Sequence, residues 1–534
     1  MEYYLGREDP WKEFGASEEQ WKDWRWQRSN VITSPQELSG YIDLSDSQIG
    51  MIENTIKSGK PMRITPYYTS LMGRNPTSVE GGLSIGYNVN GVFLQAVPTP
   101  DMYLMKAGTP DPMSEGSRSA GAFYQRYVDR GALMSSPSGQ CHMFCTHCQR
   151  GKDQGNEAVQ KGIDEGVEYI RRNENISEVL ITGGDALAIS GRKLESILKS
   201  LSGIGHVESV RIASRLPVTN PFASDPERLE MIGRYSKHTG GSSDLPNIYF
   251  ATHANSPEEL TFEMQEGVSR IRRAGFDIRN QTVLLKGVND DFKKMSRMFM
   301  DMHHMGINPR YIFQCHKVDG LASKIVPINV GQYIMSDLRG QEGSSIPTYA
   351  VNMTGGGGKV VLTPQSDFGM QDFGYRLLRN MRTWKNDVVG YEELMRVRES
   401  DYVKALYAMS EFYGDSSILD SSEHDMMEEM FYSDDKPIDI GRMANAKDIK
   451  VRESASGKYR PSVIVVSDND PDDILYVTNV STPEIMTFDN KADALGYRRN
   501  GEELGFRGQP YVTNPQGFSP DYAAVREPDF TLSV

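Results

Sequence analysis

Cysteine is scarce in this 534-residue sequence, which contains four, and three of them lie between positions 141 and 148. This count excludes a disulfide-stabilised secreted scaffold, which needs several separated cysteine pairs. No hydrophobic run approaches the ~20 residues of a membrane-spanning helix, and no apolar signal peptide precedes the charged N-terminus. Basic residues are also fewer than acidic ones, 58 against 72, and the net charge of −14 argues against nucleic-acid binding. We therefore expect a cytoplasmic protein that binds neither nucleic acid nor membrane.

The three clustered cysteines, Cys141, Cys145 and Cys148, follow the spacing C-x3-C-x2-C. An electron-transfer iron–sulfur cluster normally takes four cysteine ligands. Three ligands leave one iron open to bind and reduce a small molecule, as in enzymes that cleave S-adenosylmethionine (SAM) to begin radical chemistry. The spacing therefore predicts a [4Fe–4S] cluster in a radical SAM enzyme.

Two other interpretations of these cysteines are inert thiols and a structural zinc site. Zinc would need a fourth ligand, which Cys315, His142 or His147 could supply. Zinc sites usually pair one C-x2-C with a second ligand pair at similar spacing, and the sequence has no such second half. The spacing therefore favours the cluster.

Short β-branched runs alternate with amphipathic segments through the middle of the chain. The runs predict strands at 178–182, 209–213, 247–252, 278–285 and 310–314. The amphipathic segments predict helices near 155–173, 191–202, 226–237, 257–274 and 290–304. This alternation indicates an α/β fold with a parallel sheet and right-handed crossovers, here a full or partial (β/α) barrel. Chemistry in such barrels lies at the carboxyl ends of the strands.

The flanking regions differ from the barrel in composition. We expect a mostly helical N-terminal region at 1–120, in which Trp21, Trp24 and Trp26 pack a helix against its neighbour. The barrel would occupy 121–395. An acidic, methionine-rich linker at 420–435 and a small C-terminal α/β extension (VIVVSD, ILYVTNV, KADALGYRRNGEELGF) would fill 396–534, with no readable role.

Two glycine motifs suggest ligand sites. Gly183, Gly184 and Asp185 directly follow a predicted strand, where paired glycines let the backbone approach a ligand and the aspartate can accept hydrogen bonds from an ammonium group. The second motif is the run Gly355, Gly356, Gly357 and Gly358 followed by Lys359. Such a run can wrap an anion with its N–H groups, and the lysine can form a Schiff base. Pyridoxal 5′-phosphate needs both features, although a flexible turn with an exposed lysine would read the same way.

The chain resembles the lysine 2,3-aminomutase family of radical SAM enzymes that also use pyridoxal phosphate. The resemblance covers about residues 18 to 395 and runs through ordered blocks. These are WKDWRWQRSNVIT, the cysteine segment, EVLITGGDAL, VRIASRLPV, ATHANSPEEL, NQTVLLKGVND, LRG, IPTYAVN and GGGGK.

The resemblance implies a role for each matching residue. The three cysteines would ligate the cluster, and Gly183, Gly184 and Asp185 would hold SAM. Lys359 would carry the resting Schiff base and Arg150 would pair with the α-carboxylate of the substrate. By the same resemblance, His253 and Gln281 would line the cofactor cavity. Arg126 and Arg130 would lie near the pyridoxal phosphate.

This sequence departs from the lysine-specific members of the family at the substrate's distal end. Those members hold the distal ammonium with two aspartates, where this chain has His316 and Asn352. The family's glutamate-specific members have a lysine and an asparagine instead. Asn352 fits that pattern and Lys317 is one position from the expected lysine. Asp291 also stands where some members place an intersubunit zinc cysteine.

The resemblance therefore implies an isomerase, an amino-acid 2,3-aminomutase that turns L-glutamate into β-glutamate. Aspartate, glutamine, lysine, arginine or a neutral amino acid are alternative substrates, and radical elimination or desaturation is an alternative outcome. A non-catalytic iron–sulfur protein is a third reading. We expect an external one-electron reductant of the flavodoxin or ferredoxin type, and a homo-oligomer.

Overall fold

The computed structural model describes residues 9–76, 90–105, 107–108, 111–113, 119–136, 140–149, 162–341, 346–353, 358–363, 367–370, 375–379, 388–392, 397–415, 431–432, 452–453, 459–460, 475–477 and 511–513. The chain divides into two compact units. The first unit is Met1–Gly356 with Met395–Met426, and the second is Gly357–Leu394 with Met427–Val534.

The first unit is built on a sheet whose strands follow one another in sequence order. An antiparallel hairpin, β1 and β2, leads into β3, and from β3 to β9 every neighbouring pair is parallel. The strands are β1 (Ser119–Ala120), β2 (Phe123–Gln125), β3 (Arg130–Met134), β4 (Glu178–Thr182), β5 (Ser209–Ala213), β6 (Asn247–Thr252), β7 (Ile278–Leu284), β8 (Asn308–Gln314) and β9 (Thr348–Met353). All carboxyl ends from β3 to β9 therefore meet at one edge.

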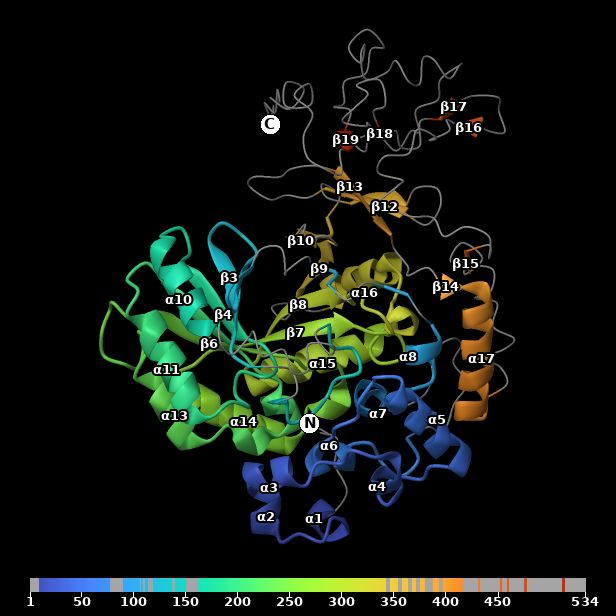
Figure 1. Ribbon diagram of the computed structural model, residues 1–534, viewed down its shortest axis with the longest axis horizontal. Helices are drawn as coiled ribbons and strands as arrows, with labels where there is room; N and C mark the ends of the chain where they lie inside the picture. The colour runs from blue at the N-terminus through green and yellow to red at the C-terminus, as the bar shows by residue number, and fades with distance from the viewer. Residues whose placement is uncertain are drawn as a thin grey trace. The chain divides into compact units, whose positions relative to one another are not determined.

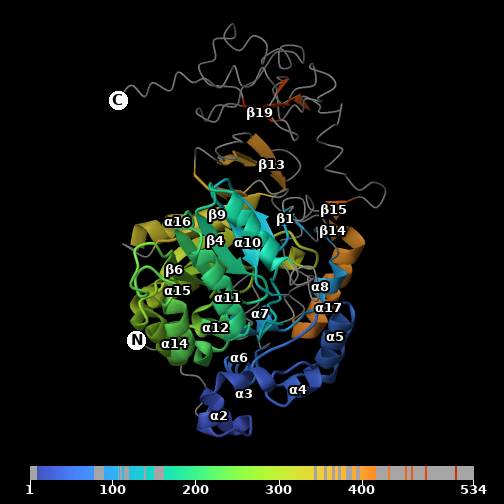
Figure 2. The ribbon, with the colours of Figure 1, turned by 60° about the vertical axis from the view of Figure 1, so that its left-hand side comes forward.

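Helices connect the parallel strands. They are α10 (Ile163–Arg172), α11 (Gly191–Ser202), α12 (Leu216–Thr219), η3 (Pro221–Ala223), α13 (Pro226–Gly233), η4 (Pro257–Glu259), α14 (Phe262–Arg273), α15 (Phe292–Met305), η5 (Ala322–Lys324) and α16 (Ile328–Gln341). Figures 1 and 2 show α10, α11 and α14 following one another along one face of the sheet. Their apolar stripes cover strands such as β4, whose Val179 and Ile181 are fully buried.

The N-terminal part of the first unit is helical. Its helices are α1 (Pro10–Glu13), α2 (Glu18–Lys22), α3 (Trp24–Ser29), α4 (Pro35–Ser39), α5 (Asp46–Lys57), α6 (Pro66–Ser70), α7 (Gly91–Ala96) and α8 (Asp101–Leu104). Ser17, Ser34 and Ser45 begin α2, α4 and α5 with capping boxes, which satisfy N–H groups that have no partner inside a helix.

A late helix returns to this N-terminal region. α17 (Glu399–Tyr413) follows the short β14 (Val397–Arg398) and packs against α5 and α8. Gln48 on α5 donates a hydrogen bond of 2.7 Å to the Phe412 carbonyl, and Ser47 donates one of 2.7 Å to Glu411. The first unit therefore includes a segment beyond the predicted barrel limit at 395, while the three-part division of the chain stays a prediction.

The second unit contains β10 (Gly358–Val361) and an antiparallel sheet of β11 (Asp367–Met370), β12 (Tyr375–Arg379) and β13 (Val388–Glu392). Its other described strands are β15 (Phe431–Tyr432), β16 (Arg452–Glu453), β17 (Tyr459–Arg460), β18 (Leu475–Val477) and β19 (Tyr511–Thr513). Part of ILYVTNV therefore forms β18. Most of the predicted linker, VIVVSD and the predicted polar helix lie outside the described residues.

The structure confirms the predicted α/β fold. Three predicted strands match β4, β5 and β6 to the residue, and the other two match β7 and β8 within two residues at one end. Within the described ranges, no helix combines the length and apolar character needed to cross a bilayer.

Candidate active site

The cysteine segment lies beyond the carboxyl end of β3 and is held by the N-terminal helical region. The Phe144 N–H donates to the Arg63 carbonyl at 2.9 Å. The Thr146 N–H donates to the Gln95 carbonyl at 2.9 Å, and its hydroxyl donates to the Leu94 carbonyl at 2.7 Å. Because α7 carries Leu94 and Gln95, this helix fixes the segment at the carboxyl edge of the sheet.

The three cysteines are half-buried. The Cys148 N–H donates to the Cys145 carbonyl at 3.2 Å, which closes a tight turn between them. Burial raises the pKa of the Cys141 thiol well above its usual range, and the nearby Asp185, Cys148 and Cys145 raise it further. The thiols are therefore close enough to interact, and a positively charged metal centre would stabilise them as thiolates.

The donor set suits a cluster better than a single ion. In the described part of the chain, no three His, Cys, Asp or Glu side chains are close enough together to hold one metal ion. A [4Fe–4S] cluster binds each thiolate at a different iron and so accepts wider ligand spacing. The alternative fourth zinc ligands point elsewhere. His142 contacts Asn220, His147 contacts His253, and Cys315 is buried at the end of β8, where desolvation raises its thiol pKa to about 12.

A histidine pair lies beside the cysteines. The rings of His147 and His253 stack with centroids 5.1 Å apart, and their Nε2 atoms are 3.1 Å apart. The Asn255 amide contacts both Nε2 atoms, at 3.3 and 3.0 Å. Burial lowers the pKa of His147 well below its usual range and that of His253 to about 3, with Arg215 adding to both shifts. Both imidazoles are therefore neutral at physiological pH.

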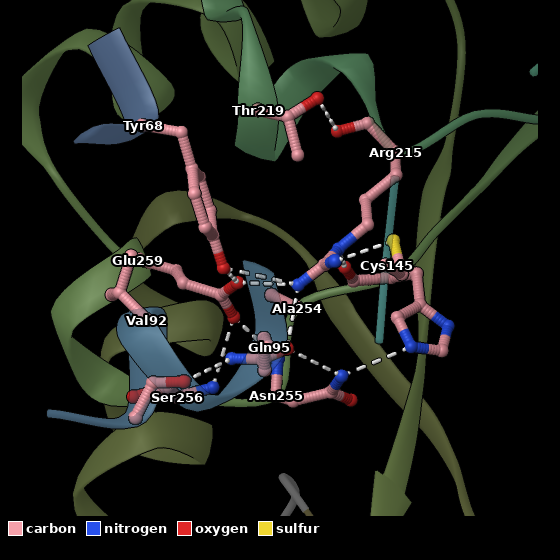
Figure 3. A network of polar contacts seen from close by, with 12 residues as sticks. Tyr68, Val92, Gln95, Cys145, Arg215, Thr219, Ala254, Asn255, Ser256 and Glu259 are labelled. Atoms are coloured by element: carbon pink, nitrogen blue, oxygen red, sulfur yellow. Dashed lines mark hydrogen bonds and ion pairs between the residues drawn. The ribbon is translucent and has the colours of Figure 1, made fainter. Parts of the chain in front are cut away.

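Arg215 links the cysteines to the barrel (Figure 3). Its guanidinium Nη1 donates to Cys145 Sγ at 2.7 Å. Its Nη2 donates to Glu259 Oε1 at 2.6 Å and to Gln95 Oε1 at 2.5 Å, while Nε donates to the His253 carbonyl at 2.9 Å. Tyr68, under the guanidinium, donates its hydroxyl to Glu259 at 2.6 Å.

This network satisfies both buried charges. The Glu259 side chain is fully buried and that of Arg215 is 9% exposed, so each needs the other. The second carboxylate oxygen of Glu259 accepts the N–H groups of Asn255 and Ser256 at 2.6 and 3.0 Å. A rigid cation is therefore aimed at one of the three cysteine sulfurs.

The turn after β4 packs tightly against the start of the cysteine segment. Gly183 has φ +127°, and a β-carbon there would lie 2.5 Å from the Ser136 carbonyl oxygen. The Gly184 N–H donates to that carbonyl at 3.0 Å. The Asp185 carboxylate accepts the N–H groups of Leu187 at 2.9 Å and Arg215 at 2.7 Å. The motif therefore joins three consecutive strand ends, and its contact with SAM stays a prediction.

The two positions predicted to distinguish substrates meet in space. β8 and β9 are parallel neighbours, with Phe313 opposite Ala350, so Asn352 near the end of β9 lies beside the residues that follow β8. The Asn352 amide nitrogen is 3.3 Å from His316 Nε2. Lys317, which directly follows His316 in the sequence, is buried.

The other predicted residues of the first unit are more dispersed. Gln281 lies half-buried on β7, opposite Tyr311 of β8. Arg130 begins β3, at the end away from the cysteines, and contacts Asp129 at 3.1 Å and Glu178 at 3.9 Å. Arg126 Nη2 lies 3.7 Å from Met113 Sδ. The phosphate role of both arginines stays a prediction.

The remaining predicted residues are in the second unit or outside the described ranges. Gly358 and Lys359 lie on β10, where Gly358 has φ +86° and Lys359 is half-buried. Arg150 and the glycines at 355, 356 and 357 lie outside the described residues. Their roles stay predictions.

Sequence reasoning did not single out Arg215, Glu259, Gln95, Tyr68 or Asn255. Three of them fall in blocks already recognised as family-like, VRIASRLPV and ATHANSPEEL. Neither block is apolar apart from the residue concerned, so the sequence carried no local signal that Arg215 and Glu259 are buried as a pair.

Comparisons with known proteins agree with this geometry. The radical SAM superfamily matches residues 135–299. L-lysine 2,3-aminomutase of Fusobacterium nucleatum is 35% identical over 356 residues, which cover 66% of this chain and 78% of the relative. L-lysine 2,3-aminomutase of Clostridium subterminale is 34% identical over 355 residues, 65% and 80% of the two chains. Glutamate 2,3-aminomutase of Clostridioides difficile is 34% identical over 391 residues, 71% and 84%.

Proposed function

Because this chain belongs to the lysine 2,3-aminomutase family of radical SAM isomerases, we propose that it moves the α-amino group of L-glutamate to the β-carbon, with pyridoxal 5′-phosphate as a third cofactor. Aminomutases of this family use a [4Fe–4S] cluster, SAM and pyridoxal phosphate. When bound, the cluster and SAM supply a carbon radical for hydrogen-atom abstraction, and pyridoxal phosphate supplies the conjugated system that lets nitrogen migrate.

The chain's own residues hold these groups. Cys141, Cys145 and Cys148 supply three thiolates for the cluster, and Arg215 orients one of them. The neutral His147 and His253 stack beside the cysteine segment without adding charge. Lys359 supplies the amine for the aldehyde of pyridoxal phosphate, and Arg150 a cation for the substrate's α-carboxylate.

The contact between His316 and Asn352 supports glutamate as the substrate. A distal ammonium would face an imidazole and an amide instead of two carboxylates, and an uncompensated buried cation is unfavourable by several kcal/mol. A distal carboxylate would instead accept hydrogen bonds from the Asn352 amide and from protonated His316 or Lys317. This binding mode requires no negatively charged side chain at position 316 or 352.

A turnover assay tests the substrate. The protein would be reconstituted anaerobically with iron, sulfide, SAM, pyridoxal phosphate and a reductant. Glutamate, aspartate, glutamine, lysine and arginine would then be offered separately, with products identified by NMR and mass. We expect β-glutamate from glutamate and little product from lysine. β-Lysine would overturn the substrate assignment while leaving the isomerase intact. A deaminated or desaturated product would show elimination or desaturation instead of migration.

The Lys359→Ala variant tests the dependence on pyridoxal phosphate. We expect it to lose the visible absorption band of the lysine-bound cofactor, because no other group would hold the aldehyde covalently, and to lose most of its turnover. Lys404→Ala on α17 is the matched control, since it removes the amine of a lysine whose side chain is 66% exposed. If the absorption band survives in Lys359→Ala as it does in Lys404→Ala, Lys359 is not the anchor of the cofactor.

A further inference from the structure

Arginine side chains gather around an aromatic pair on the outer side of the cysteine segment. We call this surface the Trp24 face and define it by Trp24, Arg25, Arg28, Arg63 and Arg228. α3, which begins at Trp24, packs against η3, and it lies beside α2 and α6 in Figure 1. Arg25 and Arg28 are exposed on α3, while the other three residues are half-buried.

The aromatic pair connects this face to a cysteine. The rings of Trp24 and His142 stack with centroids 6.0 Å apart and planes 11° from parallel. Asn220 holds the pair, because its amide donates to the Trp24 carbonyl at 3.1 Å and contacts His142 Nδ1 at 3.2 Å. His142 directly follows Cys141, so a continuous stack of two rings leads from the half-exposed Trp24 to a predicted cluster ligand.

The arginines surround that stack. Arg25 Cζ is 4.7 Å and Arg228 Cζ 5.5 Å from the Trp24 ring centroid. Arg228 is fixed by hydrogen bonds to the carbonyls of Leu187 and Ile189. Arg63 holds the cysteine segment through the Phe144 N–H, and its guanidinium lies 6.0 Å from the Phe144 ring centroid.

The charge of this face opposes that of the whole protein. Arg28 lies four residues after Trp24 on α3, so both side chains are on one side of that helix. Asp23, Asp225 and Asp185 offset part of the charge, leaving four arginines against three carboxylates. Because the chain carries −14, an acidic protein is repelled by most of its surface and steered toward a local positive face.

We propose that the Trp24 face docks an acidic one-electron carrier protein of the flavodoxin or ferredoxin type. The carrier's cofactor is oxidised by one electron, and the cluster held by Cys141, Cys145 and Cys148 is reduced by one. This assignment rests on the proposed function, since it requires the cluster to be present. It adds the surface at which the reductant binds. It also gives a reason for the arginines that surround the aromatic ring on the Trp24 face.

Charge reversal at the two exposed arginines tests the proposal. Arg25→Glu and Arg28→Glu would be reconstituted with cluster, and the rate of cluster reduction by reduced flavodoxin would be followed by stopped-flow absorbance at low and high salt. We expect each variant to slow the reaction by about tenfold or more at low salt, with the difference shrinking as salt screens the charges. Reduction by dithionite, a small molecule, should be unchanged.

Two controls separate docking from other effects. Arg28→Lys keeps the charge and should retain the flavodoxin rate. Arg172→Glu reverses a 78% exposed charge on α10 and should also retain it. Equal slowing by Arg172→Glu, slowing of dithionite to the same extent, or unchanged rates in both α3 variants would overturn the docking site while the cluster remained. A wild-type chain that forms no iron–sulfur absorbance would overturn the proposed function itself.

Discussion

Replacing Glu259 with leucine is expected to destabilise the first unit by about 3–5 kcal/mol, because it leaves the Arg215 guanidinium buried without a counter-charge. The carboxylate also accepts the Tyr68 hydroxyl and the N–H groups of Asn255 and Ser256, all of which are buried. Each donor left without a partner adds its own desolvation penalty. The free energy of unfolding in urea, followed by tryptophan fluorescence, measures the effect.

Two further variants make this prediction specific. Glu266→Leu, on the exposed side of α14, should change the free energy of unfolding by under about 0.5 kcal/mol. The double variant Arg215→Met with Glu259→Leu should recover part of the loss, because it removes both charges together. If Glu259→Leu and Glu266→Leu had equal small effects, the pair would not be the buried anchor that the distances indicate.

Replacing Cys141, Cys145 or Cys148 with alanine is expected to abolish the cleavage of SAM, which is measured as 5′-deoxyadenosine formation. Each thiolate would ligate a different iron, so loss of one would open a second iron and leave the cluster prone to dissociation. Iron and sulfide content per chain, the iron–sulfur absorbance and SAM cleavage should all fall to background in each variant. Far-ultraviolet circular dichroism should remain, since the parallel sheet does not depend on these half-buried side chains.

Cys315→Ala is the matched control for the three cysteines. Cys315 is the fourth cysteine of the chain and is buried at the end of β8. Its replacement should leave the iron content and SAM cleavage unchanged while lowering stability modestly through the small cavity it creates. Loss of iron in Cys315→Ala, or stoichiometric zinc in place of iron in the wild-type protein, would contradict the three-cysteine cluster.

Much of the fold could be read from local pattern. The strands at 178–182, 209–213 and 247–252 were predicted to the residue, because continuous β-branched runs between amphipathic segments are typical of buried parallel strands. The N-terminal helices were harder to place, since α1, α2, α3, α4 and α6 each have six residues or fewer and so show little periodicity. The return of α17 to α5 had no local signal, because a contact between positions some 360 residues apart leaves no periodic trace.

The sequence by itself determined the family, the three cysteines and the order of the α/β units, because these depend on short spacings and on periodicities within one element. Only the tertiary structure showed that Arg215 contacts Cys145 and that Glu259 neutralises the Arg215 guanidinium. It also showed that His316 contacts Asn352. It also placed Trp24 against His142. Each of these pairs joins residues far apart in the chain, and their contact depends on which strand ends and helices pack together. That choice is made by the free energy of burying whole elements, which no local stretch of sequence contains.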